Sequence, residues 1–357
     1  MTAVGRSRDL AQVYRRFGEV DAAGASPLSE RVAVALSESG EALRAIEAAP
    51  ARKRHPTVIL AALHDLALAG RAPALAAAYA TVDDDAAAGA AIDTLVRMTD
   101  AVVELAVRRP PRSDETGHGA VLYPAIVEAA CRAGAQAVGL IDVGCSAGLD
   151  LSLDRVGITY GNGQSLGDPS SPVQLSASIV GDRPVPTHSM PEVVARIGID
   201  RDPVDVTDAD DVRWLRACLW PDRPERRARL DAELALAATT PPLLLRGDAV
   251  ELLPDAVARV PADALPVVTT TWALSAFPLE SRLRFLHRLA DAATDRPVAW
   301  VSVEGVGVAP AIPTLGDRRA SGHSIIGLAA FEQSALRTEA VGRCWSRGRL
   351  LTWLANT

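Results

Sequence analysis

A run of small residues between two apolar segments is the part of the sequence best suited to chemistry. Residues 142–148 read DVGCSAG: the carboxylate of Asp142 precedes a turn made of Gly144, Cys145, Ser146, Ala147 and Gly148. Small residues let the backbone approach a ligand closely, and a helix that begins after them directs its free N–H groups at that ligand. The pattern indicates the first strand, turn and helix of a nucleotide-binding sheet.

The same turn leaves other interpretations open. It also fits G-x-S-x-G, the turn that presents the nucleophile of serine hydrolases, and Asp248 and His323 follow Ser146 in the required order. Against a hydrolase, the region upstream looks helical, whereas such a turn follows several strands. The spacing fits the G-x-G-x-x-G turn of a nicotinamide-dependent oxidoreductase poorly. A tight turn without a ligand is the structural alternative.

Further polar residues fall at the ends of other predicted strands. Apolar runs predict strands at 196–200, 243–248, 265–277 and 298–306, with helices between them. Such alternation predicts a parallel sheet with helices on both faces, and ligands bind at the carboxyl ends of its strands. The side chains expected at that edge, besides Asp142, are those of Asp200, Asp248, Thr271, Trp272 and Glu304.

The rest of the chain divides around this sheet. Residues 1–112 show helical spacing of apolar residues and are expected to form a helical lid or substrate domain. Residues 113–357 are expected to form the sheet domain, a Rossmann-like, doubly wound and mostly parallel α/β fold. Within it, 156–193 predicts a β-hairpin insertion with turns at 161–163 and 168–169.

Composition narrows the class of protein. The net charge is −7 and there is no long basic block, which argues against a nucleic-acid partner. The four cysteines lack C-x-x-C spacing, so neither a metal site nor a disulfide framework is expected. The N-terminus lacks a signal-peptide core and no stretch suits a membrane span. We expect a cytoplasmic protein that binds a small molecule, and the sequence is compatible with a homodimer.

The order of these features resembles that of class I S-adenosylmethionine-dependent methyltransferases, from about residue 120 to the C-terminus. The features are acid-x-Gly-x-x-x-Gly, a strand ending in Asp, then Gly-Asp-Ala, then a polar-ended fourth strand. More specifically, residues 143–155, 167–175, 203–230 and 246–254 resemble the uncharacterised bacterial domain-of-unknown-function family 2332. That resemblance runs over most of the chain.

The resemblance to methyltransferases implies roles for the strand-end residues. Asp142 and the backbone of the turn, from Gly144 through Cys145 and Ser146 to Gly148, would hold the methionine part of the cofactor. Asp200 would bind the ribose hydroxyls, and Asp248 and the Ala249 backbone the adenine, with Thr271 nearby. The sequence departs from the pattern twice: Ser146 replaces a glycine, and Asp200 comes far later than the usual ~20 residues after the turn.

The reaction that the resemblance implies is in-line methyl transfer to a small molecule, such as a specialised metabolite. Such an enzyme chiefly positions the acceptor, and a base helps where the acceptor must lose a proton. The candidate bases are Glu115 and His118, in a polar loop at 108–119, and Glu304. Trp220, Trp272 and Asp114 are candidate substrate contacts. Helix capping, ion pairing and core packing are the structural alternatives, and a non-catalytic binding protein on the same fold is a further one.

Overall fold

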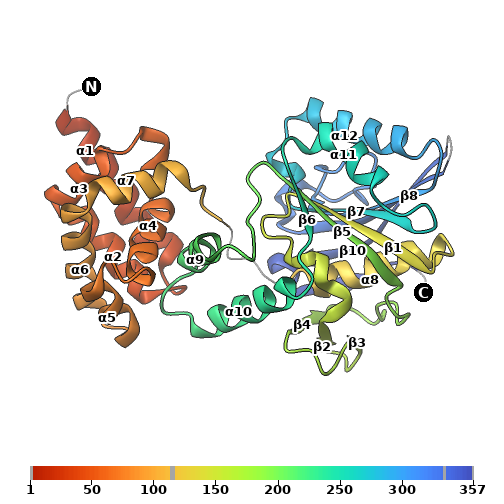
Figure 1. Cartoon of the computed structure of the whole chain (residues 1–357), viewed down its shortest axis with the longest axis horizontal. Coiled ribbons are helices and arrows are strands. Elements are labelled where there is room, and N and C mark those ends of the chain that lie inside the picture. The colour runs from red at the N-terminus through yellow and green to blue at the C-terminus, as the bar shows by residue number, and fades with distance from the viewer. Residues whose placement is uncertain (1–2, 113–116, 333–334, 356–357) are drawn as a thin grey trace. The chain divides into compact units, whose positions relative to one another are not determined.

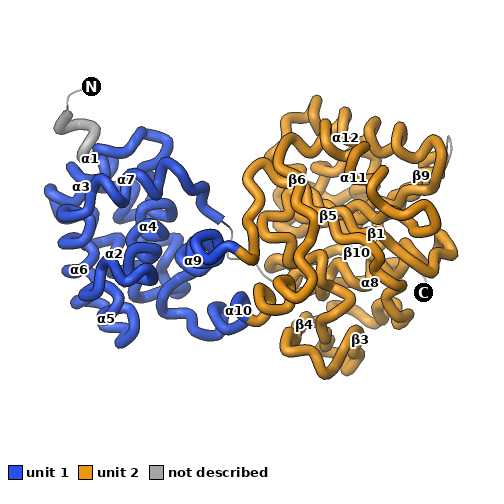
Figure 2. The backbone as a smooth tube through the Cα atoms, viewed as in Figure 1, with its two compact units in different colours: residues 1–114, 208–231 blue, residues 115–207, 232–357 orange. Residues whose placement is uncertain are grey.

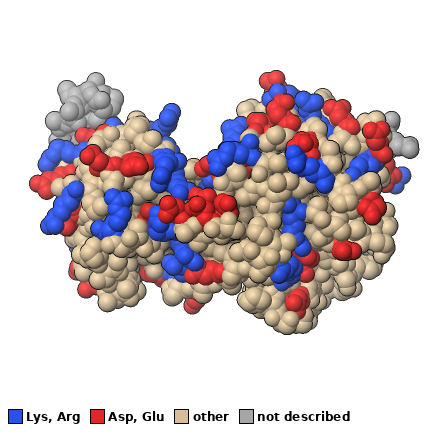
Figure 3. All heavy atoms as spheres, viewed as in Figure 1, with Lys and Arg blue, Asp and Glu red and all other residues tan. Residues whose placement is uncertain are grey.

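The computed structural model describes residues 3–112, 117–332 and 335–355, and the chain forms two compact units. Unit 1 contains residues 1–114 and 208–231, and unit 2 contains residues 115–207 and 232–357 (Figure 2). The chain therefore leaves the sheet-bearing unit once and returns to it. On the face drawn in Figure 3, acidic and basic side chains are interspersed over the surface of each unit.

Unit 1 is helical, as the apolar spacing of the N-terminal region predicts. Side-chain oxygens cap several of its helices: Ser26 accepts from the Ser29 N–H, Ser39 from the Ala42 N–H and Asp83 from the Ala86 N–H. The helices bury a core of alanine, leucine and valine with Tyr14 and Tyr79. They are α1 (Ala3–Arg16), α2 (Pro27–Glu38), α3 (Gly40–Glu47), α4 (Pro56–Leu68), α5 (Pro73–Thr81), α6 (Asp84–Arg97), α7 (Thr99–Arg108), α9 (Ala209–Ala217) and the first part of α10 (Pro224–Ala238).

Helix α9 belongs with the N-terminal helices because its buried side chains find partners there. The Trp214 indole donates to the carbonyl of Pro110 at 2.9 Å and packs against Ala61. Arg213 pairs with the buried Asp65 at 3.0 Å. Within the described residues no single helix meets the length and hydropathy needed to cross a membrane, although α4 and α5, bent by 99°, meet them together.

Unit 2 is built on one mixed sheet, which has eleven strands among the described residues. The strand order is β3-β2-β4-β11-β10-β9-β8-β7-β1-β5-β6 (Figure 1). The bounds are β1 (Ala137–Val143), β2 (Gly157–Tyr160), β3 (Ser165–Gly167), β4 (Gln174–Ile179), β5 (Glu192–Asp200), β6 (Leu243–Arg246), β7 (Leu265–Thr271), β8 (Val298–Gly305), β9 (Ser324–Glu332), β10 (Ala335–Trp345) and β11 (Leu350–Trp353).

The strands from β6 to β8 form a parallel block that carries the predicted strand-end residues. The pairs β6–β5, β5–β1, β1–β7 and β7–β8 are all parallel. Within this block, the chain adds β5 and β6 on one side of β1 and then β7 and β8 on the other. Helix α8 (Gly119–Arg132) shares one apolar core with this block, and α11 (Ala249–Ala258) and α12 (Leu279–Ala292) share the other. The prediction of a large, mostly parallel sheet with helices, after a helical N-terminal region, is confirmed.

The remaining strands extend the sheet beyond β8. Strands β9 and β10 are antiparallel neighbours, and β9 is antiparallel to β8. In the segment 156–193, β2 and β3 form an antiparallel pair, as a hairpin requires, while β2 is parallel to β4. Strand β4 pairs with β11, so this segment continues the same sheet.

Gly198 on β5 is a position where the close packing behind the turn can be tested. An added Cβ would lie 2.5 Å from Cys145 Sγ and 2.8 Å from a Leu244 methyl. We expect Gly198→Ala to lower the free energy of unfolding by about 1–3 kcal/mol in urea titrations, because the added methyl overpacks the interior. The matched control is Gly89→Ala on α6, where nothing lies within 4 Å. That change should raise stability by about 0.5–1 kcal/mol, and equal effects at the two positions would contradict the packing.

Candidate functional site

Asp142 is a buried carboxylate at the carboxyl end of β1. It lies beside Thr269 on β7, whose hydroxyl donates to Asp142 Oδ1 at 2.9 Å. Burial, together with the neighbouring carboxylates of Asp150 and Asp200, raises the pKa of Asp142 to about 8, against the opposing effects of Thr269 and His118. This environment favours the protonated form of Asp142, and a cation beside the side chain would favour the carboxylate.

The turn after β1 requires unusual backbone conformations. Gly144 and Gly148 have φ of +77° and +66°, and Ser146, which has a side chain, has φ of +51°. The Ser146 N–H donates to Asp200 Oδ2 at 2.9 Å, and its carbonyl accepts from the Val204 N–H at 2.9 Å. These two bonds hold Ser146 in a left-handed conformation that costs a non-glycine residue about 1–3 kcal/mol. The strand end at Asp200 therefore lies against the turn, despite the long segment between them.

The segment after the turn differs from the expected helix start. It is a 3₁₀ helix, η3 (Leu149–Arg155), in which Ser152 has non-helical angles of φ −104° and ψ 21°. The Arg196 guanidinium donates to the Leu151 carbonyl and pairs with Asp154 at 2.7 Å. The Leu151 carbonyl therefore accepts from a side chain of β5, whereas in a continuing helix it would accept from an N–H of the next turn. The contribution of a helix dipole to this site is correspondingly small.

A second group of polar and aromatic residues lies on the α8 side of the same strand ends. His118, immediately before α8, has Nδ1 3.0 Å from Asp150 Oδ2. Its ring meets the Trp272 ring edge-on, with the centroids 5.0 Å apart, and the Arg347 guanidinium lies 5.3 Å from the Trp272 centroid. Trp272 has φ of +54°, and its indole donates to Ser324 Oγ at 2.7 Å. The structure thus brings His118, Asp150 and Asp142 into one electrostatic neighbourhood with Trp272 beside it.

Glu304 on β8 serves the backbone of a turn. Its side chain is only 1% exposed, and it accepts from the Leu274 N–H at 2.9 Å in the short helix η4 (Leu274–Ala276). Burial raises the pKa of Glu304 to about 7, against the lowering effect of these backbone hydrogen bonds. Strand alternation puts Glu304 on the sheet face of Trp300, whereas Asp142 shares a face with Leu140. The structure does not bring Glu304 together with His118.

The residues that the resemblance assigns to adenine and ribose lie at the ends of the neighbouring strands. Asp248 caps α11 by accepting from the Val250 N–H at 2.9 Å, and Ala249 is the first residue of that helix. Asp200 pairs in register with Arg246, so the ends of β5 and β6 adjoin. At the end of β7, Thr271 Oγ1 is buried and has no hydrogen-bond partner within the described chain. Asp142, Asp200, Asp248 and Thr271 therefore all stand at the carboxyl edge of the parallel block.

Other predicted residues fall elsewhere. Trp220 belongs to unit 1, where it lines a cavity with His64. Asp114 and Glu115 lie outside the described residues. His323, the base of the hydrolase alternative, is bonded to Asp317 Oδ2 at 2.9 Å, and no hydrogen bond within the described chain joins it to Ser146.

Sequence reasoning missed Thr269 as a partner of Asp142 and Arg347 as a neighbour of Trp272. The two-residue alternation along β7 could have placed Thr269 and Thr271 on one face. No sequence signal relates Arg347, near the C-terminus, to Trp272. No group of three or more His, Cys, Asp or Glu side chains among the described residues could hold a metal ion.

Comparison with known proteins gives one match. A family model described as "Uncharacterized protein conserved in bacteria (DUF2332)" matches residues 11–353, which covers nearly the whole chain and both units. No curated protein and no solved structure matches the chain. The family predicted from the four quoted stretches is therefore confirmed: the chain belongs to the bacterial family DUF2332.

Proposed function

We propose that the protein is an S-adenosylmethionine-dependent methyltransferase that acts on a small molecule. The observation that carries the proposal is the cluster of carboxylates, Asp142 with Asp150 and Asp200, at the end of β1. This cluster lies beside a turn whose glycines have positive φ. Both features stand where a ligand of an open α/β sheet is expected.

The strand order supports this location. The parallel block reads β6-β5-β1-β7-β8, which in order of appearance along the chain is third, second, first, fourth, fifth. Doubly wound Rossmann-like sheets have this order, and they bind ligands in the crevice where the order reverses. Here the reversal lies between β1 and β7, the strands that carry Asp142, Thr269 and Thr271.

The charge of the site favours this cofactor over a dinucleotide. A pyrophosphate beside the carboxylates of Asp150 and Asp200 would be repelled, because like charges in a partly buried site interact strongly. S-adenosylmethionine has no phosphate and carries a sulfonium and an ammonium group, which the same carboxylates attract. The alternative of a nicotinamide-dependent oxidoreductase is disfavoured for this reason.

The residues of this edge fit the proposed cofactor. Asp142 would accept from its ammonium group, Asp200 and Asp248 would accept from ribose and adenine donors, and the buried Thr271 hydroxyl has bonding capacity to spare. When bound, the cofactor supplies an electrophilic methyl group on sulfur. Asp150 positions the His118 ring through Nδ1, and His118 is the candidate base for an acceptor hydroxyl. Trp272 supplies an apolar wall.

Calorimetric titration with S-adenosylmethionine and with its demethylated product tests the proposal. We expect the wild-type protein to bind both, and Asp200→Ala to bind them about tenfold or more weakly, because a charge-assisted contact is lost. Asp255→Ala is the matched control, since Asp255 is an exposed acid on α11 paired with Arg259. Absence of binding by the wild type, or equal affinities for the two variants, would refute the proposed function.

A further inference from the structure

Two turns of unit 2 with unfavourable backbone conformations meet at the side chains of Trp272 and Arg347. Trp272 directly follows β7 and has φ of +54°, and Ser346 and Arg347, between β10 and β11, have φ of +48° and +56°. Such left-handed conformations are costly for residues other than glycine and persist only where the surrounding structure holds them. The Arg347 guanidinium lies 5.3 Å from the centroid of the Trp272 ring. Both strained turns therefore end in the same side-chain contact.

The Trp272 ring is held from several sides. Its indole N–H donates to Ser324 Oγ at 2.7 Å, its backbone N–H donates to the Val303 carbonyl at 2.9 Å, and the His118 ring meets it edge-on. The residue is nevertheless only partly buried, so packing in the core does not account for these contacts. Strained residues that their surroundings hold in place cluster at ligand-binding sites. A ring fixed in this way at the carboxyl edge of the sheet is suited to contact a ligand.

Arg347 supplies a cation beside this ring. The residue is exposed. A guanidinium carries a permanent charge and five N–H donors, and its planar fork matches the two oxygens of a carboxylate. Attraction between the charge and the aromatic ring holds the group in place, and N–H donors at its outer edge can still bind an anion. An arginine over Trp272 is therefore suited to bind a carboxylate.

His118 lies against the same ring, so a small molecule can reach both groups. The His118 ring centroid is 5.0 Å from the Trp272 centroid, and the His118 ring and the Arg347 guanidinium are therefore at most about 10 Å apart. The nearby acids Asp150 and Asp200 restrict the charge of a ligand. They repel a doubly charged phosphate more strongly than a singly charged carboxylate, because the Coulomb energy is proportional to charge.

We propose that Arg347 selects the methyl acceptor and that the acceptor is a small hydroxy acid. Its carboxylate bonds to the Arg347 guanidinium, its hydroxyl lies toward His118, and its apolar body lies along Trp272. The inference rests on the proposed function and adds the substrate class to it. The hydroxyl oxygen forms a bond to the methyl carbon as the carbon–sulfur bond breaks. The hydroxyl proton passes to His118, and the electron pair of the broken bond stays on sulfur.

Calorimetric titration of the full-length protein at pH 7 with 4-hydroxybenzoate and 4-hydroxybenzamide tests the proposal. The two molecules share ring, hydroxyl and size, but only the acid is charged at this pH. The wild type should bind the acid about tenfold or more tightly than the amide, and Arg347→Gln should lose this preference, because a charge-assisted hydrogen bond is lost. Arg349→Gln, at an exposed arginine of the same turn, is the matched control and should keep the wild-type ratio. No preference in the wild type, or equal preferences in the two variants, would overturn the proposal.

A second variant separates recognition from folding. Arg347→Gly removes the guanidinium and suits the φ of +56°, so it should lose the preference for the acid without lowering the midpoint of urea unfolding. A loss of the preference together with a clearly lower midpoint would assign the strained turn to the fold and contradict the proposal.

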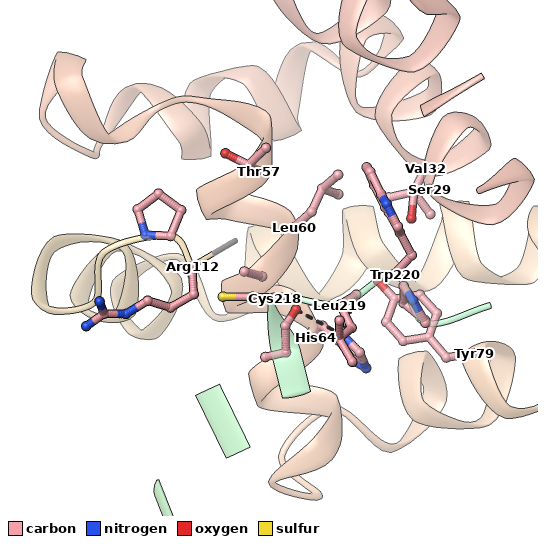
Figure 4. A pocket seen from close by; sticks show the side chains of 14 residues that line it. Ser29, Val32, Thr57, Leu60, His64, Tyr79, Arg112, Cys218, Leu219 and Trp220 are labelled. Atoms are coloured by element: carbon pink, nitrogen blue, oxygen red, sulfur yellow. Dashed lines mark hydrogen bonds between the residues drawn. The ribbon is translucent and has the colours of Figure 1, made fainter. Parts of the chain in front are cut away.

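The cavity of unit 1 is another place where an aromatic acid could find a cation. Arg112 lines it together with the rings of Trp220 and Tyr79 (Figure 4). We expect Arg112→Gln to leave the ratio of the two affinities unchanged. A loss of the ratio in Arg112→Gln as large as that in Arg347→Gln would place the binding in unit 1 and contradict the proposal.

Titration with S-adenosylmethionine keeps this proposal separate from the proposed function. Arg347→Gln should bind the cofactor as tightly as the wild type does. If the wild type binds the cofactor but does not prefer the acid, the hydroxy-acid proposal fails and the methyltransferase proposal stands. If the wild type does not bind the cofactor, the methyltransferase proposal fails, and the role of Arg347 in selecting a methyl acceptor fails with it.

Discussion

Asp142→Asn is expected to weaken binding of S-adenosylmethionine by about 10- to 100-fold without lowering the free energy of unfolding. Asn keeps the size of Asp142 and an oxygen that can accept from Thr269. It removes the negative charge that would pair with the cofactor's ammonium group, and a charged hydrogen bond in a buried site contributes about 1.5–3 kcal/mol. Calorimetry for affinity and urea titration for stability check the two halves of the expectation.

The same titration also measures the number of protons that the protein releases when the cofactor binds. Burial raises the pKa of Asp142 to about 8, so at pH 7 the free protein holds a proton there most of the time. A cation that binds beside the carboxylate lowers this pKa, and close to one proton, about 0.9 by the linkage relation, is released. Titrations at pH 7 in buffers of different ionisation enthalpy measure it, and Asp142→Asn should release none.

Two results would contradict this role of Asp142. One is wild-type affinity in Asp142→Asn. The other is a loss of affinity together with a large loss of stability, which would assign Asp142 to the fold alone. Asp255→Asn, the same substitution at an exposed acid, is the control and should change neither affinity nor proton release.

The change that Glu304→Gln makes to the free energy of unfolding is expected to be about 3 kcal/mol more stabilising at pH 8 than at pH 4. The pKa of Glu304 in the folded protein is about 7, above the ordinary value of 4.5, because the side chain is buried. The folded state thus holds this proton more tightly than the unfolded state. Its contribution to stability is complete below pH 4.5 and is lost as pH rises to about 7, and the difference in pKa sets the magnitude.

Gln retains an oxygen to accept from the Leu274 N–H and carries no charge, so it removes this pH dependence without removing the turn's partner. Urea titrations of both proteins from pH 4 to 8 measure the difference, and the contribution of Asp142 cancels because both carry it. Glu280→Gln, at an exposed position of α12, should show no such trend. A difference between Glu304→Gln and wild type that does not vary with pH would rule out the explanation.

Much of the fold could be predicted from the sequence, because the signals are local. The apolar run before Asp142, the glycines after it and the strand–helix alternation from 196 to 305 depend on residues close together in the chain. The same holds for the helical spacing of residues 1–112. Hydrophobic period and turn chemistry determine such elements, and the structure has strands and helices in these segments, although β5 begins earlier, at Glu192, and β7 ends earlier, at Thr271, than predicted.

Where the segment 208–231 packs was not predictable in the same way. Its sequence indicates helices, and α9 and α10 are there. Their membership in unit 1 depends on Trp214 reaching the Pro110 carbonyl and on Arg213 reaching Asp65. Those partners lie more than 100 residues away, and nothing in the local pattern names them.

The candidate site divides along the same line. The sequence by itself determined which carboxylates end the strands, at Asp142 and Asp200, and which residues make the turn between strand and helix. Only the tertiary structure decided that Asp200 holds the Ser146 N–H, that Thr269 partners Asp142, and that Glu304 is bonded to the η4 turn on the other face of the sheet. The physical reason is that strand-end identity follows from periodicity along the chain, whereas side-chain partners follow from strand order and register, which long-range packing sets.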